Sequence, residues 1–196
     1  MEMKDNNFNK IKGAEAIVVH NGNIVLGMQK TKRWYNLENE EKATIIKTLG
    51  GQIEKEDKNS SKRALIREVL EEVKGIEERD IRVTSNPIFT KNIRMGDLNI
   101  FERNSNLNME ADFYLLEILN KKCIEPNDLP ALLEIPIKEF LKLELTKKEN
   151  LNKLQRYVIK NKNFQFDLPG YYAFMIPKEA KEIFRRIKEY GEEIER

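Results

Sequence analysis

Three glutamates in one short segment are the residues of this sequence best suited to chemistry. Glu68, Glu71 and Glu72 lie in SKRALIREVLEEV, where apolar residues recur at spacings of three and four, which predicts a helix over 61–73. At about 100° per residue the three carboxylates fall within one sector, and the apolar side chains are expected on the opposite side. Like charges at these spacings destabilise an isolated helix by a few tenths of a kcal/mol per pair. A bound cation would relieve that repulsion.

The segment before the helix favours a metal site over an ordinary solvated acidic face. A short β-prone run, ATIIKTL, ends in Gly50 and Gly51, and a loop carrying Glu54, Glu56 and Asp57 follows. Glycine at a loop lets backbone carbonyl and amide groups approach a metal or a pyrophosphate closely. Carboxylate oxygens are the ligands that Mg²⁺ prefers, and Mg²⁺ keeps waters that substrate phosphates can replace.

Residues Gly51–Ile76 resemble the Nudix box, written G-x5-E-x7-R-E-U-x-E-E-x-G-U, in which U is a bulky aliphatic residue. The stretch R-E-U-x-E-E is matched without a gap over 67–72, and Asp57 occupies the position of the first Glu. The chain departs from the pattern by a two-residue insertion before Arg67 and by one extra residue, Lys74, before the following glycine. Both insertions flank the helix, where loops accommodate them at a small entropic cost.

The resemblance implies a fold and a reaction. The fold would be α/β (α+β): a Nudix-like α/β/α sandwich around a mixed β-sheet. The reaction would be metal-dependent hydrolysis of a pyrophosphate linkage in a nucleoside diphosphate joined to another moiety, by attack of water at phosphorus. Mg²⁺ would be the cofactor, with Mn²⁺ as a substitute, and the partner would be a small nucleotide-like diphosphate.

The resemblance also implies roles for individual residues. The catalytic group would be Glu68, Glu71, Glu72 and Arg67, with Arg67 holding a carboxylate by a charge-assisted hydrogen bond. The metal ligands would be the same three glutamates and the backbone carbonyl of Gly50. Which glutamate acts as the base differs among members of the family and stays open here.

Further candidates come from outside the helix. Gly50, Gly51 and Trp34 are expected to contact the substrate, Trp34 from a polar loop over 30–43 that could stack on a base, although a packing role is equally compatible. An additional metal ligand could come from a carboxylate outside the box; the candidates are Glu110, Asp112 and Glu125.

A second function stays open. Because Asp57 replaces a glutamate and the box carries insertions, the chain could be a catalytically weak or inactive Nudix-like domain that binds a nucleotide metabolite as a sensor or regulator. All three helix glutamates are present, which favours the enzyme.

Composition excludes several classes of protein. The 196 residues carry 35 Lys and Arg against 33 Asp and Glu, a net charge of +2, so nucleic-acid binding through bulk electrostatics is not expected. A hydrophobic content of 40% is enough to bury one core at this length. The single cysteine, Cys123, excludes an internal disulfide. No stretch approaches the roughly 18 apolar residues of a membrane span. We therefore expect a soluble, cytoplasmic protein without a membrane partner.

The remaining elements follow from local patterns. Asn21 and Gly22 predict a hairpin turn within 14–29, with His20 at the surface beside it. The other elements expected are strands over 80–90, 93–103 and 109–119, helices over 137–145 and 147–160, and a last helix from Pro177 to about Glu193.

The chain is expected to divide at residue 145. Residues 1–145 would form the Nudix hydrolase domain, and 146–196 a helical extension packed on the same domain or at a dimer interface. We favour the first arrangement, and a monomer over a homodimer, because an aromatic connector lies directly before the last helix and can fold back on it. That helix carries an apolar stripe that needs a cover: Ala180, Ile183, Phe184, Ile187, Tyr190 and Ile194.

Overall fold

The computed structural model describes residues 10–29, 35–36, 42–94, 108–143, 149–164, 171–174 and 180–194. The helices are α1 (Ser61–Glu72), α2 (Ile137–Phe140) and α3 (Ala180–Ile194), with 3-10 turns η2 (Lys55–Asp57), η3 (Glu78–Asp80), η5 (Leu151–Lys153) and η6 (Gln155–Tyr157). The strands are β1 (Lys10–His20), β2 (Asn23–Met28), β3 (Tyr35–Asn36), β4 (Lys42–Lys47), β5 (Leu49–Gln52), β6 (Val73–Lys74), β7 (Ile81–Val83), β8 (Phe89–Arg94), β9 (Asn108–Ile118), β10 (Glu125–Pro126), β11 (Ala131–Pro136), β12 (Glu149–Asn150), β13 (Val158–Lys160) and β14 (Tyr171–Phe174).

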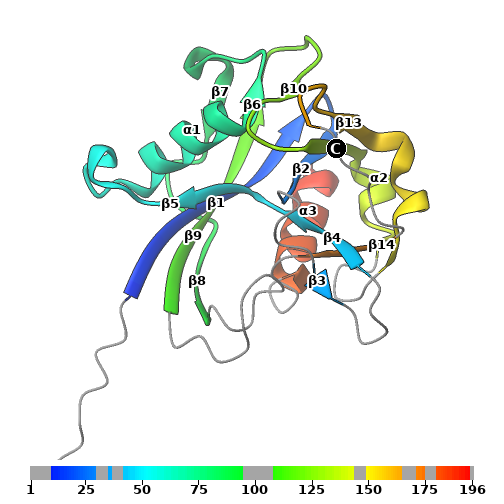
Figure 1. The fold of residues 1–196 in the computed structure, drawn as a ribbon. Coiled ribbons are helices and arrows are strands. Elements are labelled where there is room, and N and C mark those ends of the chain that lie inside the picture. Colours follow the sequence, from blue (N-terminus) through cyan, green and yellow to red (C-terminus); the bar gives the residue numbers. More distant parts are fainter. Residues whose placement is uncertain are drawn as a thin grey trace, which may run out of the picture.

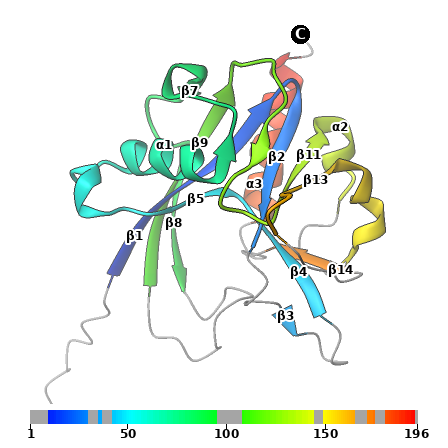
Figure 2. The same cartoon turned by 45° about the horizontal axis from the view of Figure 1, so that its top comes forward.

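The main sheet is mixed, and β1 lies between β2 and β9 in its interior. Its strands run in the order β12-β14-β4-β2-β1-β9-β7, with β11 also paired to β2, β5 to β1 and β8 to β9 (Figures 1 and 2). β1 is parallel to β9 and antiparallel to β2 and β5. The predicted hairpin between β1 and β2 is confirmed: Asn21 and Gly22 have φ of 48° and 75°, which suits a tight turn between twisted strands.

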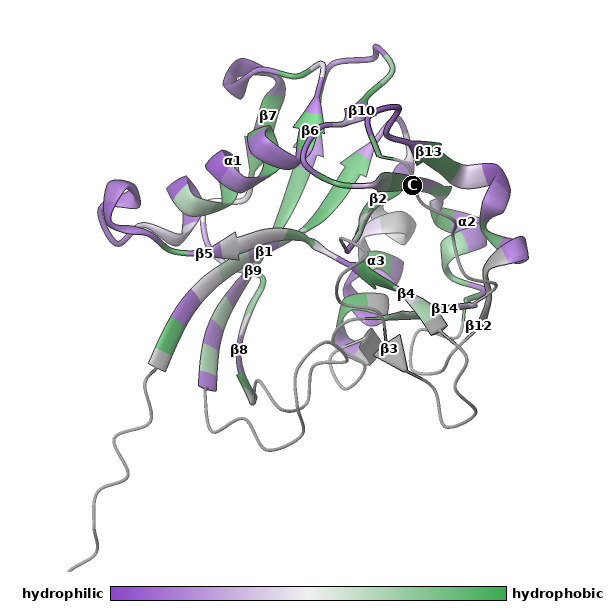
Figure 3. Cartoon of the chain, in the orientation of Figure 1, coloured by the Kyte–Doolittle hydropathy of each residue, from purple (hydrophilic) through white to green (hydrophobic). Residues whose placement is uncertain are grey.

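Alternate residues of β1 face two separate cores. Ala14 and Val18 pack in one core with Leu65 of α1, and Ile17 packs in the other with Ile187 of α3. Because successive side chains of a strand point to opposite faces, α1 covers one face of the sheet, and α2 and α3 cover the other. The strands between the helices are largely hydrophobic, and the helices carry hydrophilic segments (Figure 3). The predicted α/β/α sandwich around a mixed sheet is confirmed.

The C-terminal part of the chain is built into this sheet and core. β14 pairs in parallel with β4, and Ile183 and Ile187 of α3 are buried in the core beside Phe174. The helix expected over 147–160 was wrong: from residue 149 onward this range forms β12, η5, η6 and β13. The β-branched pair Val158 and Ile159 joins β11 instead, because pairing with a neighbouring strand outweighs local helix propensity. The division at residue 145 and the oligomeric state stay predictions.

Burial of α3 can be tested with a small deletion. Ile187→Val should lower the free energy of unfolding by about 0.5–1.5 kcal/mol, because it removes one methylene from a filled core. Urea denaturation followed by circular dichroism measures the change. Leu119→Val removes the same group from a side chain that is 46% exposed and should change stability by less than about 0.5 kcal/mol. Equal effects of the two changes would contradict the placement of α3.

Other expectations are corrected by the structure. The strand over 80–90 is divided into β7 and β8 by a stretch containing Pro87, which has no amide hydrogen for a ladder. Of the strand expected over 93–103, only the first two residues are described, and they belong to β8. The rest lies outside the described residues. α2 is shorter than the helix expected over 137–145, since it ends at Phe140. β11 was not expected at all. No helix among the described residues is long and apolar enough to span a membrane.

His20 is buried, so its expected surface position was wrong. Its exposed fraction is 1%. Nδ1 lies 2.7 Å from Glu134 Oε1, and Nε2 lies 2.8 Å from the carbonyl oxygen of Asn120. Glu134 reaches it from β11, which pairs with β2 on the other side of the hairpin. The unexpected strand therefore covers the hairpin tip.

Candidate active site

Helix α1 lies against β5 and β1 and carries the predicted catalytic residues. Ser60 caps its first turn by accepting a hydrogen bond from the amide of Arg63, and the helix ends at Glu72, which confirms the predicted element. Leu65 and Val69 anchor it in the core. The expected separation of carboxylates from apolar side chains was wrong for Glu72. It lies two helical turns after Leu65, on the same side, and is only 6% exposed.

The two glycines before the helix lie in close contact with their surroundings. Gly50 has φ of +141°, and a Cβ there would lie 2.2 Å from the carbonyl oxygen of Ala14 on β1. A Cβ at Gly51 would lie 2.5 Å from the carboxyl carbon of Glu68. Only glycine at residue 51 therefore lets the Glu68 carboxylate lie directly on the backbone of β5.

Arg67 connects the loop before the helix to two of the glutamates. Nε and Nη2 donate to the two carboxylate oxygens of Asp57, each over 3.1 Å. Nη1 donates to Glu68 over 2.8 Å and, more weakly, to Glu71 over 3.4 Å. The hydrogen bonds from Arg67 hold the pKa of Asp57 below its ordinary value. Asp57 thus forms an ion pair with Arg67 through two parallel hydrogen bonds, a forked ion pair, although two residues are inserted before Arg67 relative to the box.

Lys47, which the sequence analysis missed, lies against the innermost oxygens of the site. Its ammonium donates to Glu72 Oε1 and, over 3.2 Å, to the carbonyl oxygen of Gly50. The amide of Gly50 donates to the other oxygen of Glu72 over 3.2 Å. Burial lowers the pKa of Lys47, but the charges of Glu72 and Glu15 outweigh it and raise the pKa above its ordinary value. Lys47 is therefore a buried cation.

Glu15 is a second buried charge that the sequence analysis missed. It is 4% exposed and accepts a 2.6 Å hydrogen bond from the hydroxyl of Thr48. Burial raises its pKa to about 7, although the charge of Lys47 opposes the shift. A glutamate inside the apolar run AEAIVV was the signal available in the sequence, because a carboxylate is costly to bury without a partner.

Glu15 makes stability depend on pH. Its pKa in the folded protein lies above the unfolded value, so it stabilises the fold below the unfolded pKa, and this stability is lost as pH rises towards 7. Each unit by which the pKa is raised corresponds to about 1.4 kcal/mol. We expect the free energy of unfolding in EDTA to fall from pH 5 to pH 8, and to fall less in Glu15→Gln. Parallel urea curves at both pH values measure this difference, and an equal fall in both proteins would contradict it.

The donor chemistry of the site fits a hard divalent cation on its outer side. Glu68 is partly exposed, and the Glu71 side chain is 56% exposed. On the inner side, the Gly50 carbonyl and Glu72 contact the Lys47 ammonium instead. Within the described ranges, no three His, Cys, Asp or Glu side chains are close enough together to hold a metal ion as they stand.

The other candidates for metal or substrate binding lie on other elements. Glu110 and Asp112 lie on β9, and Asp112 accepts a hydrogen bond from the hydroxyl of Thr90 on β8. Glu125 lies on β10. None of them forms a metal-binding group with the glutamates of α1 in the part of the chain that the structure describes. Trp34 lies outside the described residues.

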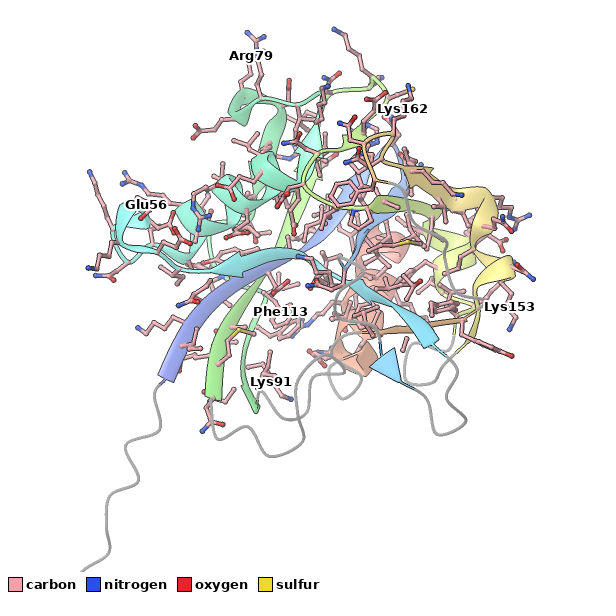
Figure 4. All side chains as sticks on the ribbon, in the orientation of Figure 1. Glu56, Arg79, Lys91, Phe113, Lys153 and Lys162 are labelled. Carbon is pink, nitrogen blue, oxygen red and sulfur yellow. The ribbon has the colours of Figure 1, made fainter. Side chains whose placement is uncertain are left out.

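A cavity of about 450 Å³ lies elsewhere in the molecule. It is formed by α2 and the η5–η6 region, and its lining includes Leu154, Tyr157 and Lys153. Lys153 and Glu56, which lies in the η2 turn before α1, are at opposite sides of the molecule in Figure 4. This cavity is therefore separate from the candidate active site.

Comparison with known proteins gives matches in structure only. No family model and no curated protein matches the chain. An Ap4A hydrolase of C. elegans, in a binary complex, is 11% identical with a TM-score of 0.46, over 67% of this chain and 84% of the hydrolase. The E. coli dihydroneopterin triphosphate pyrophosphohydrolase is 12% identical, with the same TM-score and the same coverages.

A third similar structure is a hydrolase of the Nudix family from Clostridium perfringens. It is 15% identical with a TM-score of 0.42, over 65% of this chain and 82% of the hydrolase. The solved structures that the chain resembles thus include Nudix hydrolases.

Proposed function

We propose that the protein is a Mg²⁺-dependent Nudix-type pyrophosphohydrolase that cleaves a nucleoside diphosphate linked to another moiety. One observation carries the proposal: the gapless R-E-U-x-E-E stretch lies on α1 with Glu68 seated on the backbone of Gly51. The forked ion pair between Arg67 and Asp57 supports it, because this pair fixes the helix to the loop that precedes it. A cytoplasmic location is proposed with it.

Each residue has a role in the proposed reaction. Glu68 and Glu71 would hold the cation from the solvent side, and Arg67 orients Glu68 through a charge-assisted hydrogen bond. Bound Mg²⁺ would supply neutralisation of phosphate charge and activation of the attacking water. Glu72 and the Gly50 carbonyl would become further ligands only where the Lys47 ammonium leaves them. Gly50 and Gly51 are proposed as the backbone that approaches the diphosphate. Glu68 or Glu71 would accept the proton of the water.

A substrate panel tests the proposal. The purified protein is incubated with nucleoside triphosphates, nucleotide sugars, ADP-ribose, Ap4A and dihydroneopterin triphosphate, with Mg²⁺, with Mn²⁺ or with EDTA, and the products are separated by chromatography. We expect metal-dependent cleavage of a pyrophosphate bond in at least one compound. Turnover of none of them with either metal would overturn the proposal.

The contacts of Lys47 favour a second candidate function, a domain that binds a nucleotide metabolite without cleaving it. Two of the proposed metal ligands, Glu72 and the Gly50 carbonyl, already contact this ammonium, and a weakened metal site would slow hydrolysis more than binding. Calorimetric binding of a panel member without turnover would support this candidate. Turnover that is lost in Glu71→Gln would exclude it.

The range 30–43, expected as one loop, contains β3 and the start of β4. Trp34, which lies outside the described residues, is proposed to stack on a base of the substrate. Trp34→Ala should then raise the Michaelis constant of the best substrate. An unchanged constant would remove this role.

A further inference from the structure

The innermost part of the site already contains a positive charge that belongs to the chain. Lys47 is 7% exposed, and its ammonium lies between the Gly50 carbonyl and one oxygen of Glu72. The Gly50 amide holds the other oxygen of Glu72. A closed ring of three groups results, in which both carboxylate oxygens have a hydrogen-bond donor.

The oxygens in this ring are of the kind that divalent cations require. A backbone carbonyl and a carboxylate are hard donors, and here their lone pairs point at an ammonium. Lys47 and a divalent ion would need the same oxygens, and two like charges cannot share them at contact distance. Binding of an ion at this inner position therefore requires that Lys47 first leaves it.

The outer carboxylates are more accessible: Arg67 Nη1 donates to Glu68 over 2.8 Å and to Glu71 over 3.4 Å, and neither glutamate is fully buried. Glu71 is exposed, and Glu68 contacts Arg67, whose guanidinium is also satisfied by Asp57 and by the carbonyl oxygen of Gln52. These oxygens can accept a cation while Lys47 keeps its contacts. The site is thus divided into an inner part filled by Lys47 and an outer part open to an ion.

We propose that Lys47 acts as a built-in cation which occupies the inner ion position between Gly50 and Glu72, so that the protein binds one divalent ion fewer than its oxygen ligands would allow. The proposal rests on the proposed function, because it takes the glutamates of α1 as the metal-binding group. It identifies Lys47 as a positioning residue that fixes the Glu72 carboxylate and sets the number of bound ions.

Metal binding without substrate tests the proposal directly. Mn²⁺ is titrated into wild type, Lys47→Met and Lys47→Arg, and the unbound Mn²⁺ is measured by electron paramagnetic resonance. Lys47→Met, which keeps an unbranched chain as far as Cε and removes the ammonium, should bind one more Mn²⁺ per chain than wild type. Lys47→Arg keeps the charge and should bind the wild-type number. Lys160→Met, a change of an exposed lysine on β13, is the matched control and should also keep the wild-type number.

Thermal unfolding provides a second readout. Lys47→Met leaves Glu72 buried without its cation, so added Mn²⁺ should raise the melting temperature of this variant more than that of wild type, because a ligand of the folded state stabilises it by mass action. If Lys47→Met does not fold without metal, the double variant Lys47→Met/Glu15→Gln removes one charge of each sign and takes its place in both measurements.

The outcomes separate this proposal from the proposed function. Equal numbers of bound ions and equal Mn²⁺-dependent melting shifts in Lys47→Met and wild type would overturn the role of Lys47, even if the wild type hydrolyses a panel compound. An extra ion in Lys47→Met would support that role, even if no compound is hydrolysed and the proposed function fails.

Discussion

Glu72→Gln should lower the free energy of unfolding by about 3–5 kcal/mol at pH 8 in EDTA, because it leaves the buried Lys47 ammonium without its hydrogen-bonded counter-charge. Glu72 and Lys47 are 6% and 7% exposed. Glu15 and Glu68 then still act on the ammonium through their charges, but the hydrogen bond of Glu15 is to Thr48. Urea denaturation followed by circular dichroism measures the loss.

Two comparisons make this result specific to the buried pair. Glu71→Gln changes an exposed carboxylate on the same helix and should alter stability by less than about 0.5 kcal/mol. Lys47→Met/Glu72→Leu removes both charges and should recover most of the loss, since replacing a whole buried pair by apolar side chains is often neutral. A loss below about 1 kcal/mol in Glu72→Gln would show that water solvates Lys47 and that the pair is not buried.

Glu68→Gln should lower turnover of the best panel substrate at least about 100-fold, the loss typical of removing one group that stabilises charge in a transition state. The substitution keeps the size of the side chain and removes the charge proposed to hold the cation. Stability should change little, because Arg67 keeps its forked pair with Asp57 and its hydrogen bond to the Gln52 carbonyl. Initial rates at saturating Mg²⁺ measure the effect.

The control for this experiment lies on the other side of the molecule. Glu139→Gln changes a glutamate on α2 that pairs with Lys142 and should leave the rate within a factor of two or so, as expected of a surface ion pair that contributes little. A wild-type rate in Glu68→Gln would remove this carboxylate from the reaction and leave Glu71 as the outer ligand.

Local sequence patterns predicted the elements whose structure is decided locally. The spacing of Leu65 and Val69 predicted α1, and Asn21 with Gly22 predicted the β1–β2 hairpin. The helix over 147–160 was predicted wrongly from the same kind of pattern, because β11 offers Val158 and Ile159 a strand partner that the local sequence does not reveal.

The residues of the site also fall into those that a local pattern predicts and those that it does not. The glutamates of α1 and the glycines of β5 were found because they lie in one motif. Lys47 and Glu15 were missed because their burial depends on the packing of β4, β5 and β1 against α1. A Lys at the end of a strand has no distinguishing pattern, and the position of Glu15 inside an apolar run does not reveal which cation it faces. Only the fold shows that their charges face each other.

The parallel pairing of β14 with β4 determines when during synthesis the sheet beside the site can be completed. β4 ends at Lys47, and its Ala43 pairs with Tyr171 near the other end of the described chain. The ribosome therefore exposes α1 and the glutamates long before the strand that completes the sheet beside β4. Until residues 171–174 emerge, β4 has an open edge that can pair with other nascent chains, and closing so long a loop slows folding. We expect nascent chains stalled before residue 171 to need chaperones.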